Sequence, residues 1–119
     1  MNLRKKGSKY ERIAAEYFKR LNYDLETLNW CCRWGEIDII LSHKGEIVFV
    51  EVKFRNHDSF DINEVFTLKK KNSLKRSVFI YLKDNNLFES RWRLDLFYIT
   101  CNALNNNKLI FRHFRNILL

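Results

Sequence analysis

Apolar residues three and four positions apart predict a helix near the start of the chain. The spacing i, i+3, i+4, i+7 places residues on one buried face of a helix. This spacing is found at Tyr10, Ile13, Ala14, Tyr17, Phe18 and Leu21. Ser8 stands where an N-cap is expected, and Glu11 would then fall in the first turn of the helix.

Five apolar runs predict strands. They are residues 24–30, "EIDIIL" (36–41), "EIVFVEVKF" (46–54), "RWRLDLFYI" (91–99) and "KLIFRHF" (108–114). "HKG" supplies a turn between the second run and the third. A second helix is predicted over residues 62–83, and its middle, "KKKNSLKR", reads as a solvated basic face. The order α-β-β-β-α-β-β predicts an α/β fold in which helices flank a central mixed sheet.

Length and composition indicate a single domain over residues 1–119. The chain is 46% hydrophobic and 15% aromatic, which is enough for a core without disulfides. Its apolar runs are too short to cross a bilayer, and no apolar segment follows the basic start, so we expect a cytoplasmic protein without membrane contact. Cys31, Cys32 and Cys101 are expected as reduced thiols, and no C-x-x-C pair indicates zinc.

The net charge is the first indication of a partner. With 22 Lys and Arg against 14 Asp and Glu, the chain carries +8. A basic domain favours polyanions through counterion release, and nucleic acid is the commonest polyanion in cells. A soluble surface that happens to be basic remains the alternative. Charge alone does not separate DNA, RNA and anionic lipid.

Three charged residues interrupt the apolar pattern of the "EIDIIL…EIVFVEVKF" hairpin. Side chains alternate along a strand, so Glu51 and Lys53 share a face. A turn near Lys44–Gly45 would put Asp38 almost opposite Glu51, with Cβ atoms about 4.5–5.5 Å apart. Two carboxylates that close repel each other, and a hard divalent cation relieves the repulsion.

A cation between these carboxylates favours metal-assisted phosphodiester hydrolysis. The Val52 backbone carbonyl, between Glu51 and Lys53, adds a further oxygen ligand. Lys53 could orient or deprotonate the attacking water, or neutralise charge on the phosphate in the transition state. The alternative is a structural salt bridge between Lys53 and one of the two acids. The residues by themselves leave both interpretations open.

The pattern D-x12-E-x-K resembles the catalytic core of the PD-(D/E)XK nuclease superfamily, with Ile37–Asp38 standing where many members have "PD". The chain looks more specifically like the YraN-like family of small predicted endonucleases, which is similar to archaeal Holliday-junction resolvases. The resemblance spans nearly the whole chain. It runs through "GSKYERIAAEYFKRLNYDLETLNWCCRWGEIDII", "VFVEVKFR", Thr67–Leu74, "RLDLFYI" and "IFRHFRN". It implies a restriction-endonuclease-like core.

The resemblance implies roles for four residues. Asp38 and Glu51 become metal ligands, Lys53 becomes the catalytic lysine, and the metal becomes Mg²⁺ or Mn²⁺. Glu11 matches an acid that related resolvases use for an additional metal or water contact. An acid favoured by the helix dipole is an equal alternative for Glu11. Glu36 shares a face with Asp38, but we prefer to interpret it as an exposed charge at a strand end.

Basic and aromatic residues suggest how a nucleic acid would be held. Arg55, Lys69, Lys70, Lys71 and Lys75 are candidates for phosphate contacts, and a solvated helix face is an equal alternative for each. Trp30, Trp34 and Trp92 offer surfaces for unpaired bases, but we expect them to pack against the protein instead.

Two functions follow from these observations. The first is a structure-selective endonuclease that hydrolyses DNA with Mg²⁺ or Mn²⁺, acting on branched or single-strand-containing substrates. The second is a nucleic-acid-binding module that keeps the nuclease fold without turnover. Related resolvases act as homodimers, but the sequence shows no dimer surface.

Overall fold

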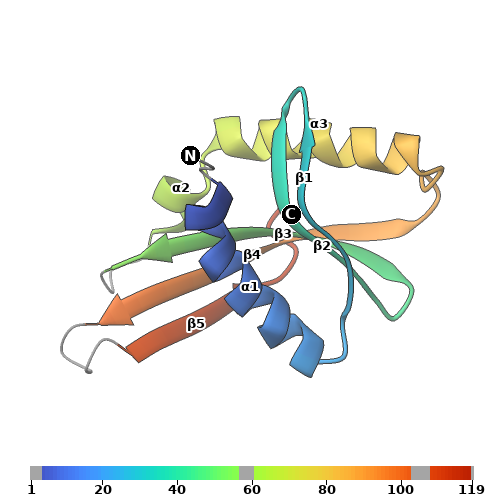
Figure 1. Ribbon diagram of the computed structural model, residues 1–119. Coiled ribbons are helices and arrows are strands. Elements are labelled where there is room, and N and C mark those ends of the chain that lie inside the picture. Colours follow the sequence, from blue (N-terminus) through green and yellow to red (C-terminus); the bar gives the residue numbers. More distant parts are fainter. Residues whose placement is uncertain (1–3, 57–60, 103–107, 119) are drawn as a thin grey trace.

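A computed structural model describes residues 4–56, 61–102 and 108–118, with the backbone alone for residues 4–8 and 102. In chain order the elements are α1 (Arg4–Arg20), β1 (Asp24–Cys32), β2 (Gly35–His43), β3 (Glu46–Arg55), α2 (Ile62–Val65), α3 (Leu68–Asp84), β4 (Arg91–Asn102) and β5 (Lys108–Phe114). The strands form one sheet in the order β1-β2-β3-β4-β5 (Figure 1). Only β3 and β4 pair in parallel; the other neighbours are antiparallel. The predicted α/β class with a mixed sheet flanked by helices is confirmed.

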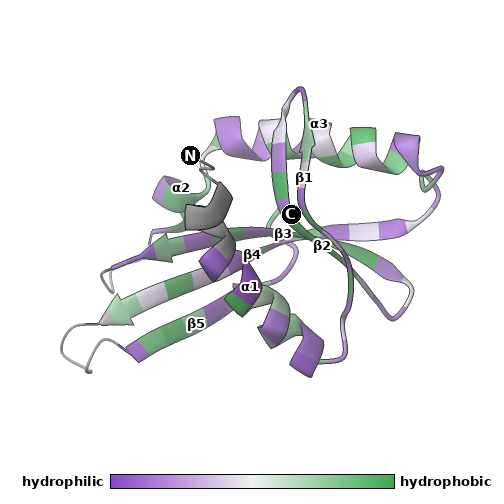
Figure 2. Ribbon diagram, viewed as in Figure 1, coloured by the Kyte–Doolittle hydropathy of each residue, from purple (hydrophilic) through white to green (hydrophobic). Residues whose placement is uncertain are grey.

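The two long helices cover opposite faces of the sheet. Along β3, Val48 and Val50 pack in the hydrophobic cluster that contains Ala14 and Phe18 of α1. Phe49, between them, packs in the cluster that contains α3. This alternation is what a strand buried on both sides requires. In Figure 2 the start of α3, where its lysines lie, is hydrophilic.

Two predictions about the helices are wrong. The first helix begins at Arg4, so Ser8 is not its N-cap and Glu11 lies well inside it. The second predicted helix is two helices, α2 and α3, because Thr67 adopts an extended conformation and caps α3. Its hydroxyl oxygen accepts a bond of 3.2 Å from the Lys70 N–H. A threonine that caps the backbone in this way ends one helix and starts the next.

The β2–β3 turn sets the register of the central hairpin. Lys44 and Gly45 both have positive φ, at 51° and 78°, as a tight hairpin turn requires. The pairing runs from His43 with Glu46 to Ile39 with Val50, so Asp38 and Glu51 are the next two positions. The predicted register is confirmed for the paired residues, but the pairing ends before Asp38 and Glu51.

Substitution of Gly45 tests how strongly this turn holds the hairpin. In Gly45→Val, a β-branched residue must adopt positive φ, and we expect the free energy of unfolding to fall by about 1–2 kcal/mol. Urea denaturation measures the change. Lys44→Asn is the matched control at the neighbouring position, because asparagine tolerates this conformation, and its effect should stay within about 0.5 kcal/mol. Equal effects at both positions would contradict the argument.

A buried polar network around Asp95 joins several strands of the sheet. Asp95 of β4 is fully buried and accepts hydrogen bonds from Arg93 Nε at 3.1 Å and from the Asn116 N–H at 2.9 Å. Its other oxygen lies 2.8 Å from Nε2 of His113 on β5. Arg93 also donates to Glu46 at 2.8 Å and to the Tyr23 hydroxyl at 2.7 Å. These bonds join β3, β4 and β5 to Tyr23, the residue before β1.

None of the described helices has the length and apolarity that spanning a membrane demands.

Candidate functional site

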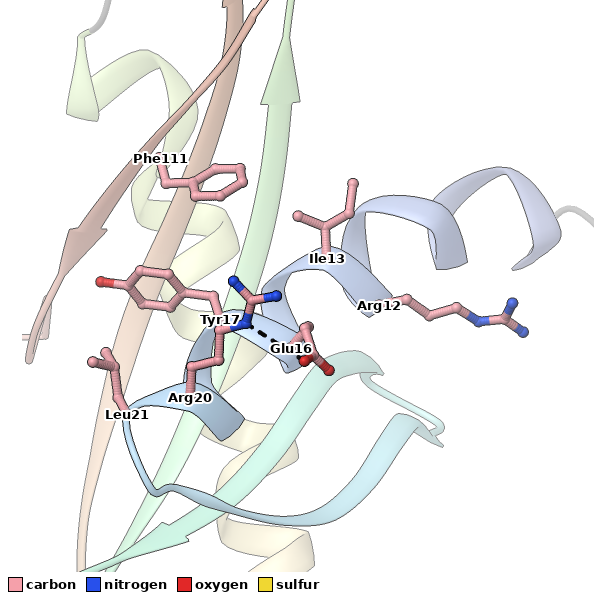
Figure 3. A pocket seen from close by; sticks show the side chains of 7 residues that line it. All are labelled: Arg12, Ile13, Glu16, Tyr17, Arg20, Leu21 and Phe111. Atoms are coloured by element: carbon pink, nitrogen blue, oxygen red, sulfur yellow. Dashed lines mark ion pairs between the residues drawn. The ribbon is translucent and has the colours of Figure 1, made fainter.

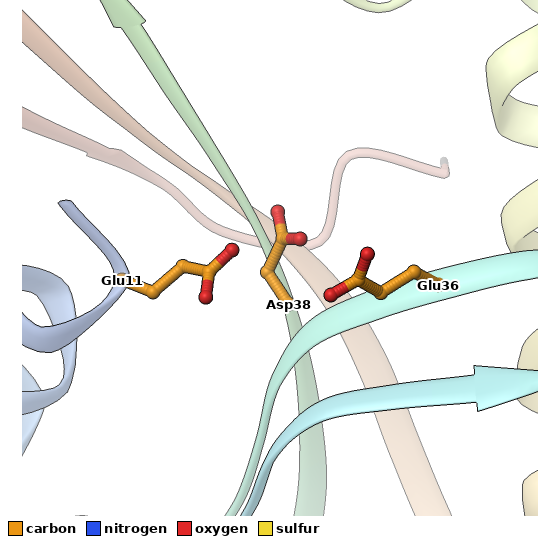
Figure 4. Close-up of side chains that lie close together, drawn as sticks. All are labelled: Glu11, Glu36 and Asp38. Carbon is orange, nitrogen blue, oxygen red and sulfur yellow. The ribbon is translucent and has the colours of Figure 1, made fainter. Parts of the chain in front are cut away.

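Three carboxylates converge between α1 and β2. Glu11 comes from α1, and Glu36 and Asp38 come from β2; each offers an oxygen that lies within 4.8 Å of the others. Figure 4 shows the three side chains pointing toward one another. Glu36 and Asp38 are half-buried, whereas only 8% of Glu11 is exposed. The position of Glu11 inside the helix removes the first-turn dipole explanation for this acid.

The sheet opens at Asp38, and the opening creates the site. Pairing between β2 and β3 ends at Ile39, while β2 continues to pair with β1 as far as Gly35. The β1–β2 hairpin thus bends away from the sheet toward α3 (Figure 1). The Val52 N–H, which β2 no longer covers, donates to Asp38 Oδ2 at 2.8 Å. Because the N–H and C=O of one strand residue point to the same edge, the Val52 carbonyl also faces this opening.

Glu51 and two lysines lie on the α3 side of the opening. Lys53 Nζ is 3.5 Å from Glu51 Oε1, so the two side chains share a face as predicted. Lys70 Nζ of α3 lies 3.3 Å from the same oxygen. Glu51 is 3% exposed, and a charge so deeply buried requires partners. The lysines provide them for Oε1 alone.

Crowded acids raise the pKa values in the site. Burial is the main cause that brings the pKa of Asp38 to about 8, the negative charge of Glu51 is the second, and the Val52 N–H opposes both. Glu11 and Glu36 raise it further. Burial likewise raises the pKa of Glu11 above its ordinary value, with a hydrogen bond from Asn29 acting against it. The protein's own groups therefore do not fully stabilise the ionised forms of Asp38 and Glu11.

Two oxygens in this region lack a partner. Within the described part of the chain, Glu11 Oε2 and Glu51 Oε2 are buried and accept no hydrogen bond. Leaving a buried acceptor unsatisfied is costly unless a further group binds it. Carboxylate oxygens at this spacing, with a carbonyl beside them, are the ligands of a hard divalent cation. The residues present therefore fit a metal site.

The structure brings together Glu11, Asp38, Glu51 and Lys53, the four residues singled out for catalysis. Two more residues belong here that the sequence interpretation missed. Glu36 was interpreted as an exposed strand-end charge, and that is wrong, because the bend of β2 turns its carboxylate toward Glu11 and Asp38. Lys70 was considered for phosphate only, but α3 places it against Glu51. The one indication in the sequence that Glu36 belongs to the site was that it shares a strand face with Asp38.

The other predicted phosphate contacts lie outside this group. Lys69 and Lys75 are exposed on α3. Lys71 is half-buried with its Nζ 6.0 Å from the centre of the Phe66 ring. Arg55, also half-buried, donates to the Phe54 carbonyl at 2.9 Å. Their role toward nucleic acid stays a prediction.

A hollow of about 600 Å³ lies away from the acids, between α1 and β5. Figure 3 shows its lining, where Tyr17 and Phe111 face each other and Arg20 pairs with Glu16 at 3.6 Å. Its walls are mostly apolar, and the converging carboxylates do not line it. It has the groups for hydrophobic contact rather than for polar chemistry.

Comparison with known proteins gives a family match over most of the chain. The family model described as "Uncharacterised protein family UPF0102" matches residues 10–99. A UPF0102 protein of Carboxydothermus hydrogenoformans is 35% identical over 119 residues, covering 99% of this chain and 98% of its own. A UPF0102 protein of Photobacterium profundum is 40% identical over 88 residues, covering 73% of this chain and 70% of its own. A UPF0102 protein of Caldanaerobacter subterraneus is 32% identical, covering 99% of this chain and 95% of its own.

Proposed function

We infer that this chain, which belongs to the protein family UPF0102, is a metal-dependent endonuclease that hydrolyses phosphodiester bonds of DNA. The inference rests on its acidic site. The observation that supports the proposal is the separation of β2 from β3 beyond Ile39. Asp38, Glu51 and Lys53, the residues that resemble the PD-(D/E)XK motif, lie at this opening of the sheet. Glu11 and Glu36 extend the acidic group.

The proposed metal is Mg²⁺ or Mn²⁺, held by Asp38, Glu51, the Val52 carbonyl and Glu11. Support comes from the unsatisfied oxygens of Glu11 and Glu51, and from the burial and the neighbouring acids that raise the pKa of Asp38. Glu36 is close enough to contribute another ligand. When bound, the cation would stabilise the negative charge that develops on the phosphate and help water to ionise.

The protein's own groups have separate tasks in this proposal. The Asp38 carboxylate accepts a hydrogen bond from the Val52 N–H, and this bond fixes the Val52 carbonyl in place. The Lys53 side chain, 27% exposed, reaches solvent from beside Glu51 and can orient the attacking water or contact the phosphate. Lys70 shares Glu51 Oε1 with it and gives this buried carboxylate a second positively charged partner. Exposed Lys69 and Lys75 would hold the phosphate backbone on either side.

The rival proposal is a nucleic-acid-binding module without turnover. The net charge of +8 favours binding under either proposal. The retained acids favour catalysis, because binding to phosphates gains nothing from buried carboxylates that repel them. A binding module therefore leaves the acidic group unexplained.

Divalent cations test the choice. With Mn²⁺ in excess over its dissociation constant, we expect the melting temperature to rise by on the order of 5–10 °C, because only the folded chain assembles the ligands. Mn²⁺ should also support cleavage of at least one substrate in a panel of four-way junction, flap, single-stranded and duplex DNA. Differential scanning fluorimetry and gel electrophoresis measure the two effects. Ca²⁺ in place of Mn²⁺ controls for charge alone. A protein that binds DNA but neither melts higher nor cuts anything with Mn²⁺ is the binding module.

A further inference from the structure

An exposed tryptophan stands beside the acidic site. Trp34 lies in the turn between β1 and β2, and 41% of it is exposed. Trp30 and Trp92 pack against the core on the α3 side, as predicted, whereas Trp34 is not among the residues of that core. The β1–β2 hairpin bends away from the rest of the sheet toward α3 (Figure 1).

Two arginines accompany the Trp34 ring. The guanidinium carbon of Arg76, on α3, is 4.7 Å from the ring centre, and that of Arg33 is 5.1 Å away. All three residues are exposed. Cation–π contacts at exposed positions are weak, and two guanidinium groups beside one ring repel each other. An anion with a flat apolar part would relieve the repulsion and cover the ring.

The turn holds Trp34 in a fixed position. Its carbonyl accepts a hydrogen bond of 2.8 Å from the Ser73 hydroxyl of α3. The next residue is Gly35 with φ of 141°, a conformation that other residues rarely adopt. Ser73 and Gly35 therefore fix the turn against α3, so the turn loses little further conformational entropy when a ligand binds.

The tryptophan is continuous with the acidic site. A small hollow between the turn and α3 is lined by Trp34, Gly35, Glu36, Lys70 and Ser73, among others. Glu36 belongs to the converging carboxylates, and Lys70 contacts Glu51. Because Trp34 and Glu36 line the same hollow, a ligand on the Trp34 ring would lie beside the acidic site.

We propose that Arg33, Trp34 and Arg76 form a stacking platform for an unpaired base of a nucleic acid strand. The base would stack on the indole ring or on a guanidinium plane, and the arginines would contact its phosphates. Paired bases in a duplex do not expose their faces, so the substrate must have an unpaired nucleotide next to the bond to be cut. A flap, a gap or a single-stranded end fits this requirement. The proposal rests on the proposed function only for the position of the cut.

Binding without cleavage tests the platform. The protein is titrated in EDTA with three fluorescent probes: a 12-nucleotide oligothymidine, an abasic strand of the same length and charge, and a 12-base-pair duplex. In Trp34→Leu, which keeps an apolar side chain, affinity for oligothymidine should fall about 5- to 100-fold. Affinities for the abasic strand and the duplex should stay within about twofold, since their phosphate contacts are unchanged. Trp34→Phe should restore most of the lost affinity.

Phe88→Ala is the matched control, because Phe88 is 62% exposed and lies beyond the C-terminal end of α3. It should bind all three probes as the wild-type protein does. Circular dichroism and thermal melting of each variant show whether it is folded. Wild-type binding by Trp34→Leu, an equal loss on the abasic strand, or no binding of oligothymidine by the wild-type protein would overturn the inference. Absence of cleavage would instead contradict the nuclease proposal and leave the platform standing.

Discussion

Replacing Lys53 with alanine is expected to lower Mn²⁺-dependent cleavage by about 100-fold or more while DNA binding changes less than about threefold. The amino group of Lys53 lies 3.5 Å from the buried Glu51, and its side chain is partly exposed to a substrate. A positioned cation that acts on the developing charge of a transition state contributes on this scale, whereas one phosphate contact among many contributes little to affinity. Single-turnover cleavage of the best substrate of the panel measures the rate, and titration in EDTA measures affinity.

Lys83→Ala is the control for Lys53→Ala. Lys83 is an exposed lysine in the last turn of α3, so its removal changes the net charge equally without touching the acids. This variant should cut at the wild-type rate. If Lys53→Ala also cuts at that rate, the assignment of Lys53 is wrong. If both variants lose binding and cleavage alike, charge rather than position is responsible.

Replacing Asp38 with asparagine is expected to stabilise the metal-free protein at alkaline pH. The folded pKa of about 8 is higher than the value of ~3.9 in an unfolded chain. An acid whose folded pKa is raised lowers the free energy of unfolding as pH rises from about 4 to 8, and the loss is complete above 8. Asparagine removes this loss and still accepts the bond from the Val52 N–H. The difference between variant and wild type should therefore widen by roughly 1–3 kcal/mol between pH 5 and pH 9.

Urea denaturation in EDTA at several pH values measures this difference. Asp84→Asn, an equivalent change at the exposed C-terminal end of α3, should show no such widening. Excess Mn²⁺ should reverse the order, because the wild-type protein gains binding free energy and Asp38→Asn loses a ligand. A constant difference across the pH range would mean that Asp38 is not held in a repulsive environment.

Local pattern was enough to predict the sheet and the core of the site. The two positive-φ residues of the Lys44–Gly45 turn fix the register, and Asp38 and Glu51 come directly after its last pair, Ile39 with Val50. The alternation of β3 then puts Lys53 on the face of Glu51. These relations depend on neighbours in one hairpin, which a sequence displays directly.

Longer-range relations could not be predicted in the same way. Lys70 reaches Glu51 from α3, and nothing in "LKKKNSLKR" distinguishes it from Lys69, which is exposed. Glu36 looks like any acid at a strand end until β2 bends away from β3. The break at Thr67 was missed because its hydroxyl bond to the Lys70 N–H outweighs the helical pattern on both sides.

The network around Asp95 and the acidic opening give two parts of the sheet different local stability. At Asp95, donors from β4, β5 and the segment after β5 meet one buried carboxylate. Where β2 leaves β3, like charges face one another and two oxygens stay unsatisfied. Fluctuations of the native state therefore begin at the acidic opening, since local stability follows the density of satisfied contacts. The acidic opening is thus the less tightly held part of the sheet, and the network at Asp95 is the more tightly held part.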